Sequence, residues 1–294
     1  MRKLKIKTLL WFCLMALFVS CTDNDDQDCA EHQTKTSYAE QVNPFNEIGE
    51  VHNDLLQSFG LYAKKDLDAF VKNSEVGDNE MDEFLEKSLI TLQSIISSQM
   101  SIANDSAAYI INESINMFNQ CAILNQNDGL SKTIREQIDT ANSIQDLIAS
   151  ISAIEADLVA KYSIDKSCES DLIAITVFKY SLNYWNTAFS DVANPWFNFL
   201  NATYENQTIA YVSSKGLFKD IWDKVKNAAH QVTTWVSNNW EHIATGVVIA
   251  ALSDYSGARC AAFGFGNPIV IGLSAGVCSV IGGLTGWTDY SIIH

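Results

Sequence analysis

The residues best placed to do chemistry lie in one short segment, which contains Asn43, Asn46, Gly49, His52 and Asn53. On a helix, Gly49, His52 and Asn53 would share a side, with Asn46 one turn earlier. A histidine near glutamates suits a metal ligand or a general acid–base group. We favour a structural His52–Asn53 pair instead, because no second ligand pair follows at helical spacing.

Other catalytic signatures are missing from the sequence. The remaining histidines are scattered, and no G-x-S-x-G, H-E-x-x-H, C-x-x-C or phosphate-binding loop occurs. We therefore assign no catalytic residue and expect neither a metal nor a cofactor. An enzymatic role centred on His52 stays open as the less favoured hypothesis.

The N-terminus reads as a lipoprotein signal peptide over residues 1–20. Four basic residues and no acid occupy residues 1–7, and an uncharged apolar run follows. This run of about 12 residues is too short to span a bilayer, which needs roughly 20. Phe18, Val19, Ser20 and Cys21 are similar to a lipobox. We expect cleavage after Ser20 and lipid attachment to Cys21.

The segment after Cys21 indicates where the protein is sent. Residues 21–42 open with an acidic, polar run that predicts a flexible tether. The run also resembles the acid-rich signal that directs some Gram-negative lipoproteins to the outer face of the outer membrane. The expected location is therefore the cell surface, with a lipid anchor in the outer membrane.

The charge of the mature chain limits its partners. Loss of the four basic signal residues leaves 15 basic and 35 acidic residues, a net charge of −20. No basic patch is present, so nucleic acid is excluded as a partner. A protein partner or a target bilayer remains.

Residues 43–212 have the pattern of an all-α bundle. The chain has only three prolines, and apolar residues recur at helical spacing. This period predicts helices over 44–59, 78–101, 106–125, 143–161 and 167–189. Ser143 and Asn43 are the expected N-caps, and the aromatic cluster near Trp185 and Trp196 is expected in the core. An up-and-down helical domain is the simplest assembly.

Residues 213–294 differ in composition from the bundle. Residues 215–294 carry five basic and five acidic residues, and nine of the chain's 14 glycines follow Ala244. Residues 216–240 predict an amphipathic helix with Trp222, Trp235 and Trp240 on its apolar edge. These tryptophans are candidates for contact with a membrane or a partner, although a core-facing stripe is favoured.

An apolar helical hairpin is expected after the amphipathic helix. Its predicted arms are residues 243–263 and 268–287, and residues 261–288 contain no charge. Gly272 with Gly276 and Gly282 with Gly286 form small-x-x-x-small pairs, which allow close helix contact. The second arm is long enough to cross a bilayer. Burial within the protein is slightly favoured over membrane insertion.

The cysteines allow disulfides without defining them. Removal of Cys13 with the signal and use of Cys21 for lipid leave five, an odd number. Cys260 with Cys278 could staple the hairpin, and Cys121 with Cys168 could join two helices. Spacing alone supports neither pair.

Two segments carry a family resemblance. Uncharacterised secreted and lipidated bacterial proteins have an Asn-x-x-Asp-x-x-Gly-x-x-His-Asn-x-x-Leu segment near the mature N-terminus and a Gly/Ala-rich end opened by Asp-x-x-Gly-Ala. Residues 43–56 resemble the first, with Asn46 in place of Asp, and Asp254, Gly257 and Ala258 match the second. The resemblance implies an exported helical protein and brings no activity, because none is known for the group.

Three functional hypotheses follow from the sequence. The chain is expected to be a surface-anchored, non-enzymatic protein that binds a partner. The first alternative is a membrane-active protein, bacteriocin-like or pore-forming, that uses residues 215–287. The second is a metal-dependent or hydrolytic protein centred on His52.

Overall fold

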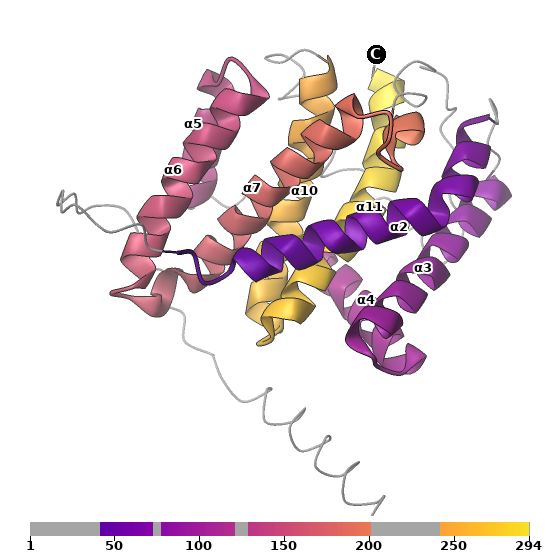
Figure 1. Ribbon diagram of the computed structural model, residues 1–294, viewed down its shortest axis with the longest axis horizontal. Coiled ribbons are helices and arrows are strands. Elements are labelled where there is room, and N and C mark those ends of the chain that lie inside the picture. The colour runs from indigo at the N-terminus through magenta and orange to yellow at the C-terminus, as the bar shows by residue number, and fades with distance from the viewer. Residues whose placement is uncertain (1–41, 73–77, 121–128, 201–241, 294) are drawn as a thin grey trace, which may run out of the picture. The chain divides into compact units, whose positions relative to one another are not determined.

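A computed structural model describes residues 42–72, 78–120, 129–200 and 242–293, apart from side chains at some helix ends. The described residues are 87% helical and contain no strand, which confirms the all-α class (Figure 1). The helices are α2 (Asn46–Lys72), α3 (Asp78–Met100), α4 (Asn104–Gln120), α5 (Gly129–Thr140), α6 (Ile144–Tyr162), the short η2 (Lys166–Cys168), α7 (Glu169–Ser190), α10 (His242–Gly264) and α11 (Pro268–Ile293).

Local side-chain signals define several helix ends. α6 begins after Ser143, whose hydroxyl oxygen accepts the backbone N–H of Asp146 over 3.1 Å, as expected of an N-cap. α11 begins at Pro268, where the preceding Asn267 side chain accepts the N–H of Ile269 over 2.9 Å.

The predicted start of α2 was two residues early. The Asn43 side chain accepts the N–H of Phe45 over 2.8 Å, so it closes a turn ahead of α2 rather than capping the helix. α2 also continues to Lys72, well past its predicted end at Phe59. α5 was not predicted at all.

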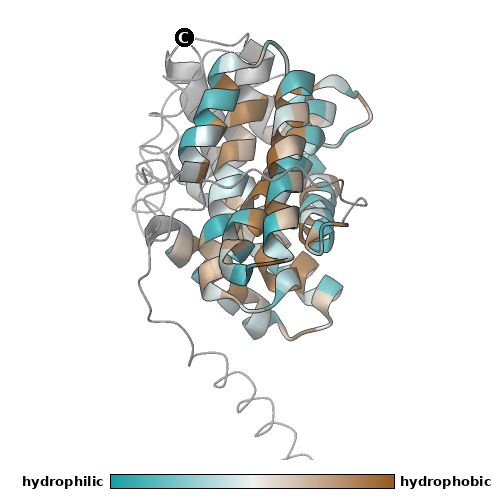
Figure 2. Cartoon of the chain, turned by 90° about the vertical axis from the view of Figure 1, so that its left-hand side faces the viewer, coloured by the Kyte–Doolittle hydropathy of each residue, from teal (hydrophilic) through white to brown (hydrophobic). Residues whose placement is uncertain are grey.

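The hairpin of α10 and α11 lies among the other helices of the described part (Figure 1). α10 packs against α7, α11 packs against α2, and both contact α4. Every residue from Ile271 to Val280 is buried, so this part of α11 is covered on all sides. A helix that is apolar all round is stable in water only when it is enclosed in this way. Figure 2 shows polar residues along the outer helices, as such an enclosure requires.

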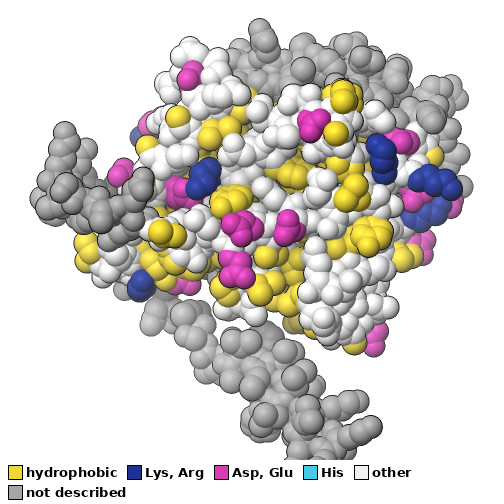
Figure 3. Space-filling model, in the orientation of Figure 1, with side chains coloured by type: hydrophobic (Ala, Val, Ile, Leu, Met, Phe, Trp, Pro, Cys, Tyr) yellow, Lys and Arg dark blue, Asp and Glu magenta, His cyan; other side chains and the backbone are white. Residues whose placement is uncertain are grey.

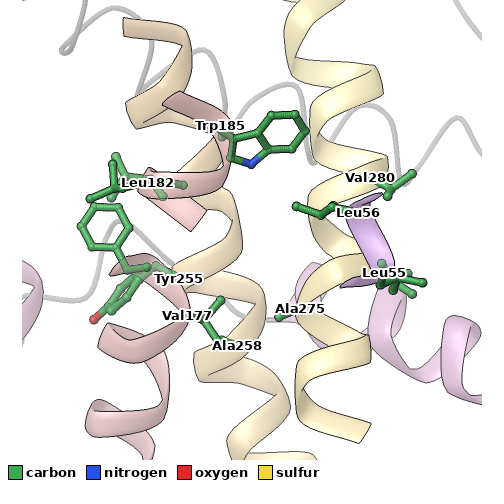
Figure 4. Packing of buried hydrophobic residues seen from close by; sticks show 14 of the residues in the cluster. Leu55, Leu56, Val177, Leu182, Trp185, Tyr255, Ala258, Ala275 and Val280 are labelled. Atoms are coloured by element: carbon green, nitrogen blue, oxygen red, sulfur yellow. The ribbon is translucent and has the colours of Figure 1, made fainter. Parts of the chain in front are cut away.

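The apolar core continues from the bundle into the hairpin. Figure 4 shows Leu55 and Leu56 of α2 near Ala275 and Val280 of α11. Full burial of a leucine contributes about 1.5–3 kcal/mol, so contacts of this kind are a main source of stability. The composition change near residue 213 therefore separates two stretches whose described parts share one core.

The aromatic cluster is part of this core, as predicted. Trp185 and Trp196 have no exposed surface, and their rings meet edge to face with centroids 5.4 Å apart. The Trp196 ring also stacks on Phe59, and its Nε1 donates to the backbone carbonyl of Leu56 over 2.9 Å. The rings thus join the segment after α7 to α2.

Within the described residues, none of the helices combines the length and the apolar character that crossing a membrane requires.

Candidate functional site

The chemistry-bearing residues of α2 meet α7 and α10 at a polar cluster inside the apolar core. His52 comes from α2, Asp254 from α10, and Ser181 and Trp185 from α7. None of these four side chains has exposed surface. A buried polar group left without a partner costs about 1–3 kcal/mol, so such groups must satisfy one another. We call these four residues, together with Asn53, the His52–Asp254 cluster.

The neighbours of His52 determine where its ring carries protons. Its Nδ1 lies 2.9 Å from Oδ1 of Asn53. The Asn53 amide nitrogen donates to the backbone carbonyl of Tyr180 over 3.2 Å, which leaves the amide oxygen facing the imidazole. Nδ1 must therefore be the donor, because an amide oxygen only accepts.

The other ring nitrogen of His52 faces a carboxylate. Nε2 lies 3.2 Å from Oδ2 of Asp254, within ion-pair distance but not aligned as a hydrogen bond. The contact brings α2 and α10 together through two side chains that have no exposed surface.

One oxygen of the Asp254 carboxylate contacts side chains from two other helices, α2 and α7. Oδ2 accepts from the Ser181 hydroxyl and from Trp185 Nε1, the latter over 3.1 Å, in addition to its contact with His52. Oδ1 has no hydrogen-bond partner among the described residues. Removing a carboxylate from water is costly, and the donors at Oδ2 offset part of that cost.

The connection within the cluster differs from that of a serine hydrolase. In a Ser-His-Asp triad the imidazole stands between the hydroxyl and the carboxylate and accepts the proton of the hydroxyl. Here the carboxylate stands in the middle, and Ser181 donates to Asp254 instead of to His52. This arrangement holds helices together but does not activate the Ser181 hydroxyl as a nucleophile.

The surroundings of His52 do not resemble a metal site. The described residues contain no group of three or more His, Cys, Asp or Glu side chains that could hold a metal ion. A ligating imidazole needs a free nitrogen, whereas Nδ1 of His52 faces Asn53 and Nε2 faces Asp254.

Asn43 has a different role from His52, although both belong to the predicted motif. Its amide nitrogen donates to Glu155 over 2.6 Å and to Thr176 over 2.7 Å, so it ties the start of α2 to α6 and α7. Glu155 also pairs with Lys179. The residues of the sequence motif therefore belong to two polar clusters, one around His52 and Asp254 and the other around Asn43 and Glu155.

The other two motif residues contribute through packing. A Cβ on Gly49 would lie 2.4 Å from the ring of Tyr180, so α2 and α7 approach more closely than any larger residue allows. The Asn46 side-chain oxygen is buried and has no hydrogen-bond partner among the described residues.

The second segment of the resemblance meets the first in space. Asp254 contacts His52, and the following Gly257 packs against α11, where an added Cβ would lie 2.7 Å from Cβ of Cys278. Ala258 is fully buried. Two stretches about 200 residues apart thus form one contact region, which the sequence did not predict.

Sequence reasoning missed Asp254, Ser181 and Trp185 as members of this site. The sequence did contain one signal for Asp254. Within residues 242–288, only Asp254 and Arg259 are of a permanently charged type. A charge within an apolar helix requires a buried partner. Both have one: Asp254 pairs with His52, and Arg259 lies 3.3 Å from Asp171 of α7. Nothing in the sequence marked Ser181 or Trp185.

The glycines of α11 make the close contact that their spacing predicted. A Cβ on Gly272 would lie 2.7 Å from the backbone oxygen of Ile48, and one on Gly276 would lie 2.8 Å from Leu55. The partner helix is α2, which the sequence did not identify. Gly282 and Gly286 fall within α11, but their surroundings lie outside the described residues.

The proposed Cys260–Cys278 disulfide is wrong. Cys260 is disulfide-bonded, whereas Cys278 keeps a buried free thiol. Gly257 is the residue of α10 that approaches Cys278, where an added Cβ would lie 2.7 Å from the Cys278 Cβ, and Cys260 lies one turn further along the helix. Burial raises the pKa of the Cys278 thiol strongly, and the negative charge of Asp254 raises it further. Cys168 likewise keeps its thiol, which excludes the Cys121–Cys168 pair.

Four further predicted residues lie outside the described part of the chain. These are the lipidation site Cys21 and the tryptophans Trp222, Trp235 and Trp240.

Comparison with known proteins leaves the site without a precedent. No family model, curated protein or solved structure matches this chain.

Proposed function

We propose that this chain is a lipid-anchored bacterial surface protein that acts by binding a partner and not by catalysis. One observation carries the non-enzymatic part: His52, Asp254 and Ser181 are fully buried and are paired with one another. A catalytic group must reach a substrate, and these side chains face only other parts of the fold.

The anchoring part of the proposal rests on the N-terminal sequence. A basic start, a short apolar run and Ser20-Cys21 support processing as a lipoprotein, and the acidic stretch that follows supports display at the outer membrane surface.

Metabolic labelling with a fatty acid tests the anchor in a Gram-negative host. We expect the full chain to incorporate the label and the variant Cys21→Ala to lose it. Cys29→Ala is the matched control, because it removes the neighbouring cysteine and should keep the label. Labelling that survives in Cys21→Ala would refute the assignment, and protection of the wild-type chain from added protease on intact cells would refute surface display.

Metal uptake tests the alternative of a metalloprotein centred on His52. Equilibrium dialysis of the folded chain against zinc should give no stoichiometric uptake that His52→Ala removes. Asp54→Ala is the control, because its carboxylate is exposed on the same helix. Tight binding lost only in His52→Ala would favour a metal site over our proposal.

Membrane activity is a second candidate, favoured by the enclosed position of α11. α11 does not meet the requirements of a membrane span, but it carries no charge from Pro268 to Thr288 and would contact lipid if the surrounding helices moved apart. The full chain, incubated with dye-loaded vesicles across a range of pH, tests this candidate. Dye release would support membrane activity, whereas intact vesicles at every pH and lipid composition would leave the binding role.

A further inference from the structure

Four large apolar side chains stay exposed where the described chain begins and where helices turn. Val42 precedes α2, and Ile164 lies between α6 and α7. Phe263 and Ile269 flank the turn between α10 and α11. Their exposed fractions are 82% for Val42, 81% for Ile164, 73% for Phe263 and 38% for Ile269. We call these four residues the apolar end.

Contacts between α11 and α2 place Ile269 and Phe263 near the start of α2. Gly272 approaches Ile48 and Gly276 approaches Leu55, so α11 crosses α2 close to the first turns of both helices (Figure 1). The first turn of α11, which holds Ile269, therefore lies beside the first turn of α2. Phe263 is on the other side of the same hairpin turn, in the last turn of α10.

Independent contacts place Ile164 at the same end. Asn43 bonds to Thr176 and Asn53 bonds to Tyr180, so α7 runs in the direction of α2. The connection that leads into α7, where Ile164 lies, therefore sits at the start of α2. A ring contact between Phe45 and Tyr162, with centroids 5.2 Å apart, joins these two regions. In Figure 3 hydrophobic side chains reach the surface at the lower left, where α6 leads into α7.

The preceding chain links this end of the bundle to the proposed lipid anchor. Twenty residues separate Cys21 from Val42. At about 3.3–3.6 Å per residue, they reach at most about 70 Å. A lipid on Cys21 would keep the apolar end, where the tether joins the bundle at Val42, within this distance of the bilayer.

Charge does not provide an alternative means of membrane contact here. Glu47 and Glu50 are exposed on the first turns of α2, and Figure 3 shows acidic side chains over that part of the helix. Their negative charges repel anionic lipid headgroups, so contact with the membrane must come from apolar side chains. The turn between α10 and α11 is suited to apolar contact with lipid, because residues 260–288 carry no charge.

We propose that the apolar end, formed by Val42, Ile164, Phe263 and Ile269, rests on the lipid surface that holds the Cys21 anchor. This orientation deepens the proposed function and rests on it. It would turn the far ends of α2 and α7 away from the membrane and present them to a partner.

Photo-crosslinking in the anchored full chain tests the orientation. Benzoylphenylalanine replaces one residue at a time, in cells whose lipids carry radioactive phosphate. Phe263 and Ile164 are the test sites. Tyr62 and Val192 are matched controls, with exposed fractions of 76% and 77% at positions away from this end. All four side chains are exposed, so the substitutions should not impair folding.

Three outcomes separate the orientation from the anchor itself. Phosphate-bearing adducts several-fold stronger at 263 and 164 than at 62 and 192 would support the proposal. Equal or weaker adducts at 263 and 164, with Cys21 still fatty-acylated, would overturn the orientation and leave the anchor. A wild-type chain without fatty acid would refute the proposed function, and protein adducts at 263 in place of lipid would also overturn the orientation.

Discussion

The imidazole of His52 and the carboxylate of Asp254 form the only described ion pair in which neither side chain has exposed surface. The other described pairs retain exposure, including Lys179 with Glu155 at 21% and 8%. A fully buried pair contributes little when it is intact, because its mutual attraction is offset by lost hydration. A displaced α2 or α10 would separate these two side chains and leave polar groups without this neighbour in the core.

A double-mutant cycle tests this pair. We expect Asp254→Leu and His52→Leu each to lower the free energy of unfolding by about 3–5 kcal/mol, because each leaves a buried charge or polar group unpaired. The double variant should lose clearly less than the two single losses combined. Denaturant unfolding measures all four proteins, with exposed Asp54→Leu as the control; strict additivity would show that the two residues do not interact.

The thiol of Cys278 gives a second prediction at the same scale. Burial and the nearby Asp254 raise its pKa above the ordinary value of 9.0. An alkylating reagent should therefore leave Cys278 unmodified in the native protein at pH 8 and modify it after unfolding. Mass spectrometry of Cys278 peptides measures the reaction, and rapid native modification would contradict the burial.

The same thiol predicts a dependence of stability on pH. The unfolded chain ionises Cys278 more readily than the folded chain, so alkaline conditions favour unfolding. Relative to Cys278→Ala, the wild-type protein should keep its stability below pH about 9 and lose it progressively above. Parallel unfolding curves of both proteins from pH 7 to about pH 10 measure the difference, and parallel pH profiles would contradict the prediction.

At the scale of elements, the approach of α11 to α2 depends on two glycines. Gly272→Ala would bring a Cβ within 2.7 Å of a backbone oxygen, which cannot move without shifting α2. We expect a loss of about 1–3 kcal/mol in the free energy of unfolding, as for other overpacked sites.

Gly264→Ala is the matched control for this prediction. Its Cβ would meet the Met117 side chain, a flexible group that can move aside. We expect a change of less than about 1 kcal/mol. Equal effects of the two substitutions in thermal or denaturant unfolding would show that the contact between α11 and α2 is less close than described.

For the molecule as a whole, the position of the hairpin predicts a hierarchy of local stability. α10 and α11 are enclosed by α2, α4 and α7, whereas α5 packs mainly on α6. Backbone amides in the buried part of α11 should exchange hydrogen only through global unfolding, and those of α5 should exchange through local opening. Hydrogen exchange followed by mass spectrometry measures both, and fast exchange in residues 271–280 would contradict the core position.

Much of the helical content could be predicted because its signals are local. The spacing of apolar residues and the Ser143 cap act within one or two turns, so α3, α6 and α7 lie close to their predicted ranges. The break at Asn267 and Pro268 likewise located the hairpin turn. α5 was not predicted, although its buried residues Ile134 and Ile138 are one turn apart, because so short a helix has few such positions.

The candidate site could be predicted only in part. Asn43, Gly49, His52 and Asn53 were singled out by type and spacing, and Nδ1 of His52 lies 2.9 Å from Oδ1 of Asn53. Their partners could not be predicted, because periodicity identifies a buried face without identifying the face opposite. The wrong disulfide has the same cause, since chain spacing did not show that Gly257 is the residue facing Cys278.

The sequence by itself determined the all-α class and most of the helix-forming segments, and it is the sole basis for the expectation of a lipid anchor at Cys21. Only the tertiary structure decided that α11 lies inside the bundle, and that His52 meets Asp254. The physical reason is one of range: helix formation and capping act between near neighbours, whereas core packing depends on which distant side chains fit together.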